Sequence, residues 1–234
     1  MKNNYTRANV VRIIFYLMMA LDIISAYSNI MQYSLLKSAS SGIGVNAEQA
    51  ASNDLRQQII ALIQLPLIIA TIISFIMWYH RSYKNLHELK IHTLQFTPGW
   101  AAGAWFVPFL NLARPYTIMR EIWDNTQSYV LPKDTGIRPS PATIVGAWWT
   151  FWILNNVLGN ISGRIAINAE SVDQLLISTQ VSIASDVVDM IAMILTLIMI
   201  TRMMDYERSL WDFVNDPFNR IKEENTGSMN VSGI

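Results

Sequence analysis

The sequence contains no cysteine, which excludes disulfide bonds, thiolate metal sites and cysteine nucleophiles. Charged residues are also scarce, because they fill 15% of the 234 positions where a soluble domain has about 25%. Neither sign of charge is in excess, since 17 basic residues balance 17 acidic ones, so nothing predicts nucleic acid as a partner. No phosphate-binding loop, dinucleotide fingerprint or nucleophile elbow is present. The sequence therefore predicts no cofactor and no catalytic residue.

Hydrophobic residues make up 52% of the chain and are gathered into long runs with few or no charged residues. A helix needs about 20 apolar residues to cross a hydrocarbon layer about 30 Å thick. Four runs meet this length and predict an all-α membrane bundle: Ile13–Leu36, Ile59–Tyr79, Ala142–Ile161 and Val181–Met203. The first is too long for a signal peptide, so we expect an uncleaved anchor. We also expect one membrane domain over residues 1–216 and a polar, disordered cytoplasmic tail over residues 217–234.

A fifth uncharged stretch, Leu94–Leu112, is interrupted by prolines and glycines. Basic residues accumulate on the cytoplasmic side of membrane proteins and can decide its path. If the stretch enters the membrane and returns, only Lys37, Arg56 and Arg164 of the 17 basic residues lie outside, which leaves 14 inside. If it spans, the 17 divide 10 to 7. The sequence therefore predicts a re-entrant segment, four crossings and both termini in the cytoplasm.

Several tryptophan-rich motifs lie between the second and third predicted spans. They are W-x-x-R-x-x-x-N-L from Trp78, T-P-G-W at Thr97–Trp100, W-F-x-P-x-x-N-L at Trp105–Leu112, M-R-E-I-W at Met119–Trp123 and the pair Trp148–Trp149. This series resembles the bacterial family called domain of unknown function 4328, over roughly Ile59–Ile161. The resemblance implies a multi-spanning protein of the bacterial inner membrane, and it implies no reaction.

The polar residues of these motifs are candidates for binding a ligand or a lipid headgroup at the cytoplasmic face: Arg81, Asn85, Asn111, Arg114, Arg120 and Glu121. Alternatively, the arginines hold lipid phosphates and the asparagines cap broken helices. Between Arg114 and Gln127 the apolar residues recur opposite Arg120, Glu121 and Asp124, which predicts an amphipathic helix on the membrane surface.

A second set of polar residues lies within or near the predicted spans: Asp22, Asn156, Asn160, Arg164, Asp186 and Asp189. Ionisable groups at this depth are costly and suggest a proton or ion path. The alternative for Asp186 and Asp189 is a structural salt bridge with Arg164, or helix capping. The G-x-x-x-G spacing of Gly159 and Gly163 beside the asparagines permits a packing seam or a dimer interface.

These observations favour a non-enzymatic scaffold or regulatory subunit in the lipid bilayer, with a cytoplasm-facing surface for a membrane-protein partner or a second copy of the chain. A small transporter or channel using the acidic residues is the alternative, and a lipid-acting enzyme using Arg81 and Glu121 is a third. The histidines of His87-Glu88-x-x-x-His92 are five residues apart rather than four, so no zinc site is predicted.

Overall fold

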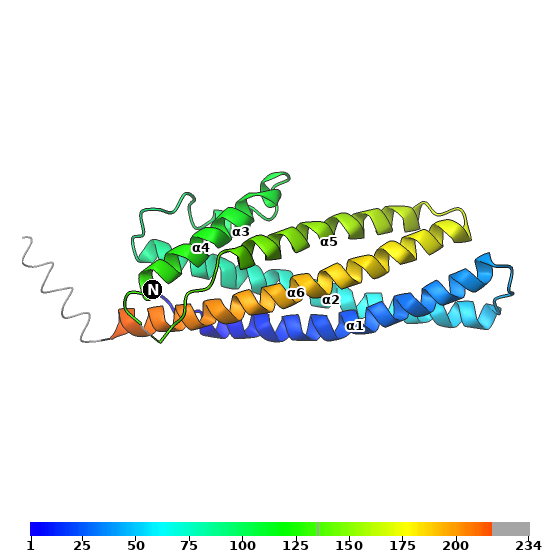
Figure 1. Cartoon of the computed structure of the whole chain (residues 1–234), viewed down its shortest axis with the longest axis horizontal. Coiled ribbons are helices and arrows are strands. Elements are labelled where there is room, and N and C mark those ends of the chain that lie inside the picture. Colours follow the sequence, from blue (N-terminus) through cyan, green and yellow to red (C-terminus); the bar gives the residue numbers. More distant parts are fainter. Residues whose placement is uncertain (135, 217–234) are drawn as a thin grey trace, which may run out of the picture. The chain divides into compact units, whose positions relative to one another are not determined.

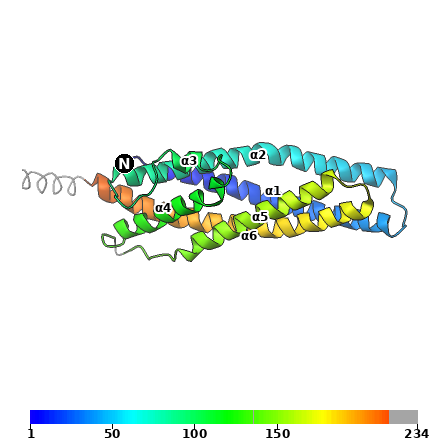
Figure 2. The ribbon, with the colours of Figure 1, turned by 90° about the horizontal axis from the view of Figure 1, so that it is seen from above.

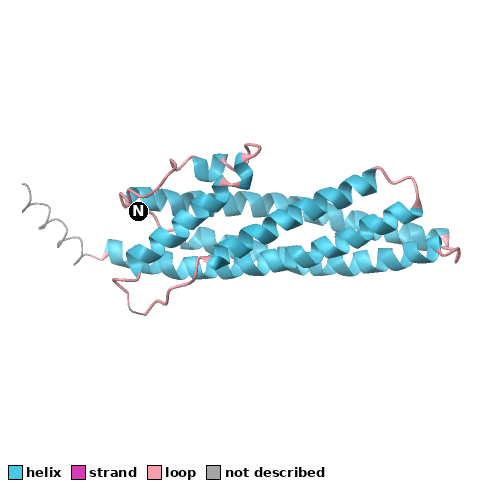
Figure 3. Cartoon of the chain, turned by 45° about the horizontal axis from the view of Figure 1, so that its top comes forward, coloured by secondary structure: helices cyan, strands magenta, loops and turns pink. Residues whose placement is uncertain are grey.

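A computed structural model describes residues 1–134 and 136–216, and all regular structure in these residues is helical (Figure 3). The predicted all-α class is therefore confirmed. The predicted disordered tail, residues 217–234, lies outside the described residues. In chain order the helices are α1 (Tyr5–Ser40), α2 (Ala47–Glu88), α3 (Trp100–Gly103), η1 (Leu110–Leu112), α4 (Arg114–Val130), α5 (Thr143–Ile167) and α6 (Val172–Asn215) (Figure 1).

Three of these helices, α1, α2 and α6, are long and apolar enough to cross a membrane. They contain three of the four predicted spans. The fourth prediction falls on α5, whose 25 residues give about 37 Å of helix. Asn155, Asn156 and Asn160 lower its hydropathy, and it is not among the helices that meet both the length and the composition of a span.

The chain divides into two compact units, which we describe separately. The aromatic unit consists of Met1–Val10, Phe75–Val145 and Met199–Ile234, the last described as far as residue 216. The four-helix unit consists of Val11–Ser74 and Gly146–Ile198, and so contains parts of α1, α2, α5 and α6.

In the four-helix unit, consecutive helices run in opposite directions, as both ribbon views show (Figures 1 and 2). Hydrogen bonds fix the register: Arg56 of α2 donates to Ser28 of α1 at 2.8 Å, and Gln32 of α1 contacts Thr179 of α6 at 3.3 Å. The outward faces are apolar, and Leu62 on α2 is 73% exposed. Such a surface is stable in lipid and unfavourable in water.

The aromatic unit instead has a closely packed core. All of the largest fully buried side chains in the described residues belong to it: Trp78, Tyr79, Tyr83, Leu86, Ile118, Met119, Ile122, Trp123, Met199, Ile200, Met203 and Tyr206. They come from α2, α4 and α6, so the predicted amphipathic helix exists as α4 and buries its apolar side. Glu121 was expected on the exposed side of α4 and is instead buried, because its neighbours supply hydrogen-bond donors.

Residues 94–112 of the aromatic unit contain only the short helices α3 and η1, of four and three residues. Phe109 precedes η1 with a φ of 65°, a backbone conformation that is rare for a bulky side chain. Its ring is 86% exposed, and that of Phe106 is 72% exposed. This segment therefore presents aromatic side chains outward.

Candidate functional sites

Arg81 and Asn85, at the end of α2, bind each other and their surroundings. The Arg81 guanidinium donates to Asn85 Oδ1 at 2.6 and 2.9 Å and to the Glu88 carboxylate at 2.8 and 2.9 Å. The Asn85 side chain also accepts from the backbone N–H of Lys2 and donates to its carbonyl. Both side chains are buried, so in this structure they hold the N-terminal residues against α2.

Glu121 belongs to a separate cluster around the Tyr83 hydroxyl. Tyr83 donates to Glu121 Oε2, and the backbone N–H of Gln95 donates to Oε1 at 3.1 Å. The Phe96 N–H in turn donates to the Tyr83 oxygen at 3.2 Å. This cluster ties the start of residues 94–112 to α2 and α4. Tyr83 was not among the residues selected from the sequence. Its spacing of four residues from Tyr79 could have identified it, because this spacing places two aromatic hydroxyls on one helix face.

Arg114, at the start of α4, is held by aromatic rings. Its guanidinium lies 3.9 Å from the centroid of Trp100 and 5.2 Å from that of Phe96. Its Nη1 is buried and has no hydrogen-bond acceptor among the described residues. Arg120 lies on the exposed side of α4 and pairs with Asp124 at 3.3 Å, while Asn111 lies in η1. The six predicted headgroup residues therefore do not form one cluster.

Asp22, Asp186 and Asp189 of the four-helix unit do come together. Asp22 is 5% exposed, and its Oδ1 accepts from Gln64 at 3.2 Å. Its other oxygen, Oδ2, is buried without a hydrogen-bond donor. The carboxyl groups of Asp22 in α1 and Asp189 in α6 lie close enough to interact electrostatically. Asn155 of α5 donates to Asp189 at 2.6 Å.

Asp186 extends this acidic cluster by one turn of α6. It accepts from Asn29 at 2.7 Å, and Asn29 accepts from Gln57 at 3.4 Å. A side-chain amide thus donates a hydrogen bond to each of the three carboxyl groups, and no ion pair in the described part of the chain involves any of them. These amides, Asn29, Gln64 and Asn155, were not selected from the sequence, because their bonds to the carboxyl groups depend on which helices pack against each other.

The predicted partner of the acidic residues, Arg164, is exposed and forms no ion pair with Asp186 or Asp189. The expected salt bridge is therefore wrong, since amide donors of α1 and α5 occupy the two carboxyl groups. Asn156 and Asn160 are exposed, and each donates to a carbonyl of its own helix, at 2.8 and 2.7 Å. These three residues of α5 are not part of the acidic cluster.

Three long helices, each apolar enough to cross a membrane, indicate a helical membrane protein. A family model described as Domain of unknown function (DUF4328) matches residues 42–205, and the chain belongs to this family. The predicted resemblance is confirmed, and the match extends beyond it to include Asp186 and Asp189 but not Asp22. Comparison with curated proteins and with solved structures finds no match.

Proposed function

We propose that the protein is a small proton-linked transporter or channel in which Asp22 and Asp189 bind and release a proton. The observation that carries this proposal is the proximity of these two acidic side chains, with no basic residue of the described chain in an ion pair with either. Ionised carboxylates only accept hydrogen bonds, so two of them can bond to each other only while one holds a proton. Two charges at this position would repel each other and leave Asp22 Oδ2 without compensation.

The depth of Asp22 in α1 makes a purely structural role expensive. An aspartate at the centre of a spanning helix costs about 2.5–3.5 kcal/mol on insertion scales. A side chain added only for packing would be apolar, whereas this one faces Gln64 and two further carboxyl groups. Asp186 and Asp189 are three positions apart and share a face of α6. A proton bound by Asp22 and Asp189 therefore has a third carboxyl group, that of Asp186, one helical turn away.

For the membrane placement, we propose four crossings by α1, α2, α5 and α6, with residues 94–112 re-entrant and both termini on the cytoplasmic side of the bacterial inner membrane. The distribution of basic residues supports this arrangement, because 14 of 17 then lie inside. The short helices α3 and η1 support it further, since about 20 helical residues are needed to cross. The exposed rings of Phe106 and Phe109 suit a segment that dips into lipid.

Purified protein in liposomes that contain a pH-sensitive dye tests the proposed function. An imposed potential should drive proton uptake, and Asp22→Asn or Asp189→Asn should abolish it. Asp173→Asn is the matched control, because Asp173 is an exposed acid at the start of the same helix as Asp189 and bonds only to Ser40 among the described residues. Uptake that survives in Asp22→Asn, or that is lost equally in Asp173→Asn, would contradict the proposal.

A second candidate, a non-enzymatic scaffold or regulatory subunit, is favoured by Arg114. A guanidinium held on two aromatic rings with one buried, unoccupied N–H group suits an acceptor supplied by another molecule. Gentle detergent extraction followed by mass measurement separates the two candidates. A stable complex with a second protein and no proton uptake by the purified chain would favour the scaffold over the transporter.

A further inference from the structure

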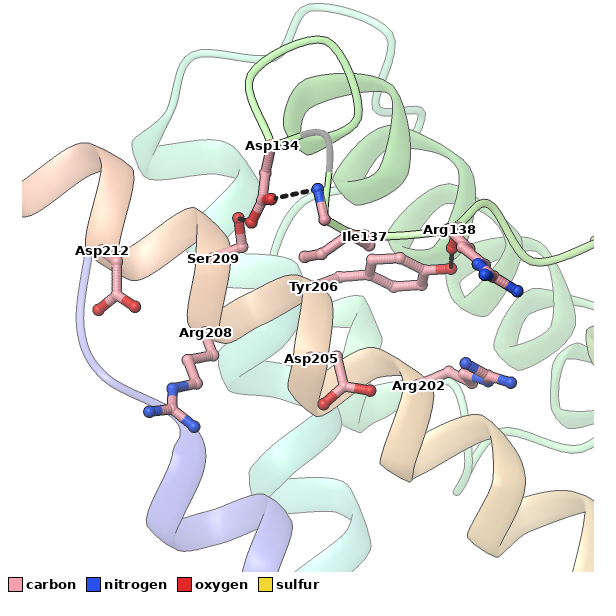
Figure 4. A pocket seen from close by; sticks show the side chains of 10 residues that line it. Asp134, Ile137, Arg138, Arg202, Asp205, Tyr206, Arg208, Ser209 and Asp212 are labelled. Atoms are coloured by element: carbon pink, nitrogen blue, oxygen red, sulfur yellow. Dashed lines mark hydrogen bonds between the residues drawn. The ribbon is translucent and has the colours of Figure 1, made fainter.

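A polar pocket of about 440 Å³ lies in the aromatic unit, between the end of α6 and the loop that follows α4 (Figure 4). Three arginines and three aspartates are among its lining residues. None of these six residues was a candidate in the sequence analysis. The pocket is also separate from the acidic cluster, which belongs to the other unit.

The charges in this pocket do not neutralise one another by direct contact. Asp134 is engaged by the Ser209 hydroxyl at 2.7 Å and by the Gly136 N–H at 2.9 Å. These hydrogen bonds hold the pKa of the Asp134 carboxyl below its ordinary value. Arg138, Arg202 and Arg208, by contrast, form no ion pair within the described residues. The pocket therefore offers guanidinium donors that its own carboxylates leave unused.

Two of these arginines, Arg138 and Arg202, lie on one side of the pocket, next to Tyr206 (Figure 4). The buried Tyr206 hydroxyl donates to the backbone carbonyl of Arg138 at 2.9 Å, and its ring packs edge-on against Trp123. Arg202 lies one turn before Tyr206, on the same face of α6. Figure 4 shows the guanidinium groups of Arg138 and Arg202 on the same side, away from Asp134 and Asp212.

The position of Arg202 in the chain places this side of the pocket beside a bilayer. Residues 190–201 of α6 carry no charge, and Arg202 is the first charged residue after them. An arginine at the end of an apolar spanning run extends to the level of the lipid phosphates. The hydrogen bond from Tyr206 fixes the backbone of Arg138 one turn of α6 away from Arg202.

We propose that Arg138 and Arg202 bind the phosphodiester of an anionic phospholipid. Guanidinium groups bind phosphate oxygens through paired, charge-assisted hydrogen bonds. Asp205, three residues after Arg202, also lines the pocket and reduces its positive charge. Two guanidinium groups beside one carboxylate suit the single negative charge of a phosphodiester better than the double charge of a phosphate monoester.

The test is lipid binding by the full chain in mild detergent, measured by native mass spectrometry with phosphatidylglycerol and phosphatidylcholine. We expect phosphatidylglycerol to bind about tenfold more tightly, and Arg138→Gln or Arg202→Gln to remove about tenfold of that affinity. Arg7→Gln is the matched control, because it removes one exposed arginine of the same unit outside the pocket, and it should change affinity less than twofold.

Both pocket substitutions should leave the thermal unfolding temperature unchanged, since Arg138 contacts Tyr206 through its backbone and Arg202 is exposed. Equal affinity for the two lipids, or equal losses in Arg7→Gln and Arg202→Gln, would overturn the proposal. Displacement of the lipid by inorganic phosphate at millimolar concentration would assign the pocket to a soluble phosphate and would overturn the lipid assignment.

Discussion

Replacement of Tyr83 by phenylalanine tests how residues 94–112 are held in the aromatic unit. The ring of Tyr83 is fully buried, and phenylalanine keeps its volume, so the substitution removes only the hydroxyl. That hydroxyl donates to Glu121 and accepts from the Phe96 N–H. Its loss leaves a buried carboxylate oxygen and a backbone N–H without these partners.

The magnitude follows from these two hydrogen bonds. A hydrogen bond to a charged group contributes about 1.5–3 kcal/mol, and a neutral one contributes about 1 kcal/mol. We therefore expect Tyr83→Phe to lower the free energy of unfolding by about 2–4 kcal/mol, and the unfolding temperature by roughly 5–10 °C for a chain of this size. The amide of Phe96 should also exchange its hydrogen faster.

Unfolding of the detergent-solubilised protein, followed by the fluorescence of its eight tryptophans, measures this loss. Tyr5→Phe is the matched control, because Tyr5 belongs to the same unit and is 48% exposed, and it should change stability by less than about 0.5 kcal/mol. A loss below 1 kcal/mol in Tyr83→Phe, with unchanged exchange at Phe96, would refute the reasoning.

Two further substitutions have signs that the structure determines. A Cβ at Gly163 would meet nothing within 4 Å, so Gly163→Ala should stabilise α5 by about 0.5–1 kcal/mol in thermal unfolding. A loss of stability, or dissociation of an oligomer in light scattering, would instead reveal a helix packed on this face. Ser209→Ala should raise the pKa of Asp134 toward its ordinary value, because one of its two hydrogen bonds is lost. In the wild-type protein the stabilisation from this hydrogen bond is present at neutral pH and is lost as the pH falls through the lowered pKa of Asp134. A carbon-13 NMR titration of Asp134 measures both pKa values, and an unchanged pKa in Ser209→Ala would contradict the assigned role of the Ser209 hydroxyl.

The spanning helices could be predicted because their signal is local. A largely apolar run of about 20 residues identifies a span without any knowledge of its neighbours, and three such runs became α1, α2 and α6. The weaker case is α5, where a helix was correctly expected but asparagines reduce its apolar character. The motifs around Trp78 and Trp105 likewise identified the family from the chain alone.

Pairings between helices could not be predicted in the same way. Asp22 and Asp189 lie on the first and last long helices, and nothing in either segment indicates that they face each other. Arg164 was selected because it lies at the outer end of the preceding helix, but a position near the same end of the bundle does not set the direction of a side chain. Glu121 was assigned to the exposed face of α4 because its apolar neighbours recur opposite it, yet it lies at the border of that face, where a tyrosine from α2 decides its burial.

Burial alone does not distinguish a structural acid from a functional one, as Glu207 and Asp22 illustrate. Glu207 is 6% exposed, but its carboxylate accepts from Asn4 and from the Trp78 indole, so its oxygens are compensated within the aromatic unit. Asp22 is equally buried, has one amide donor, and keeps one oxygen without a donor beside a second acid. A protein interior that only needed packing would not retain such a pair, because it is stable only while it holds a proton or another cation. The number of hydrogen-bond donors therefore favours Asp22, and not Glu207, as the carboxyl group that would bind and release a proton in the proposed function.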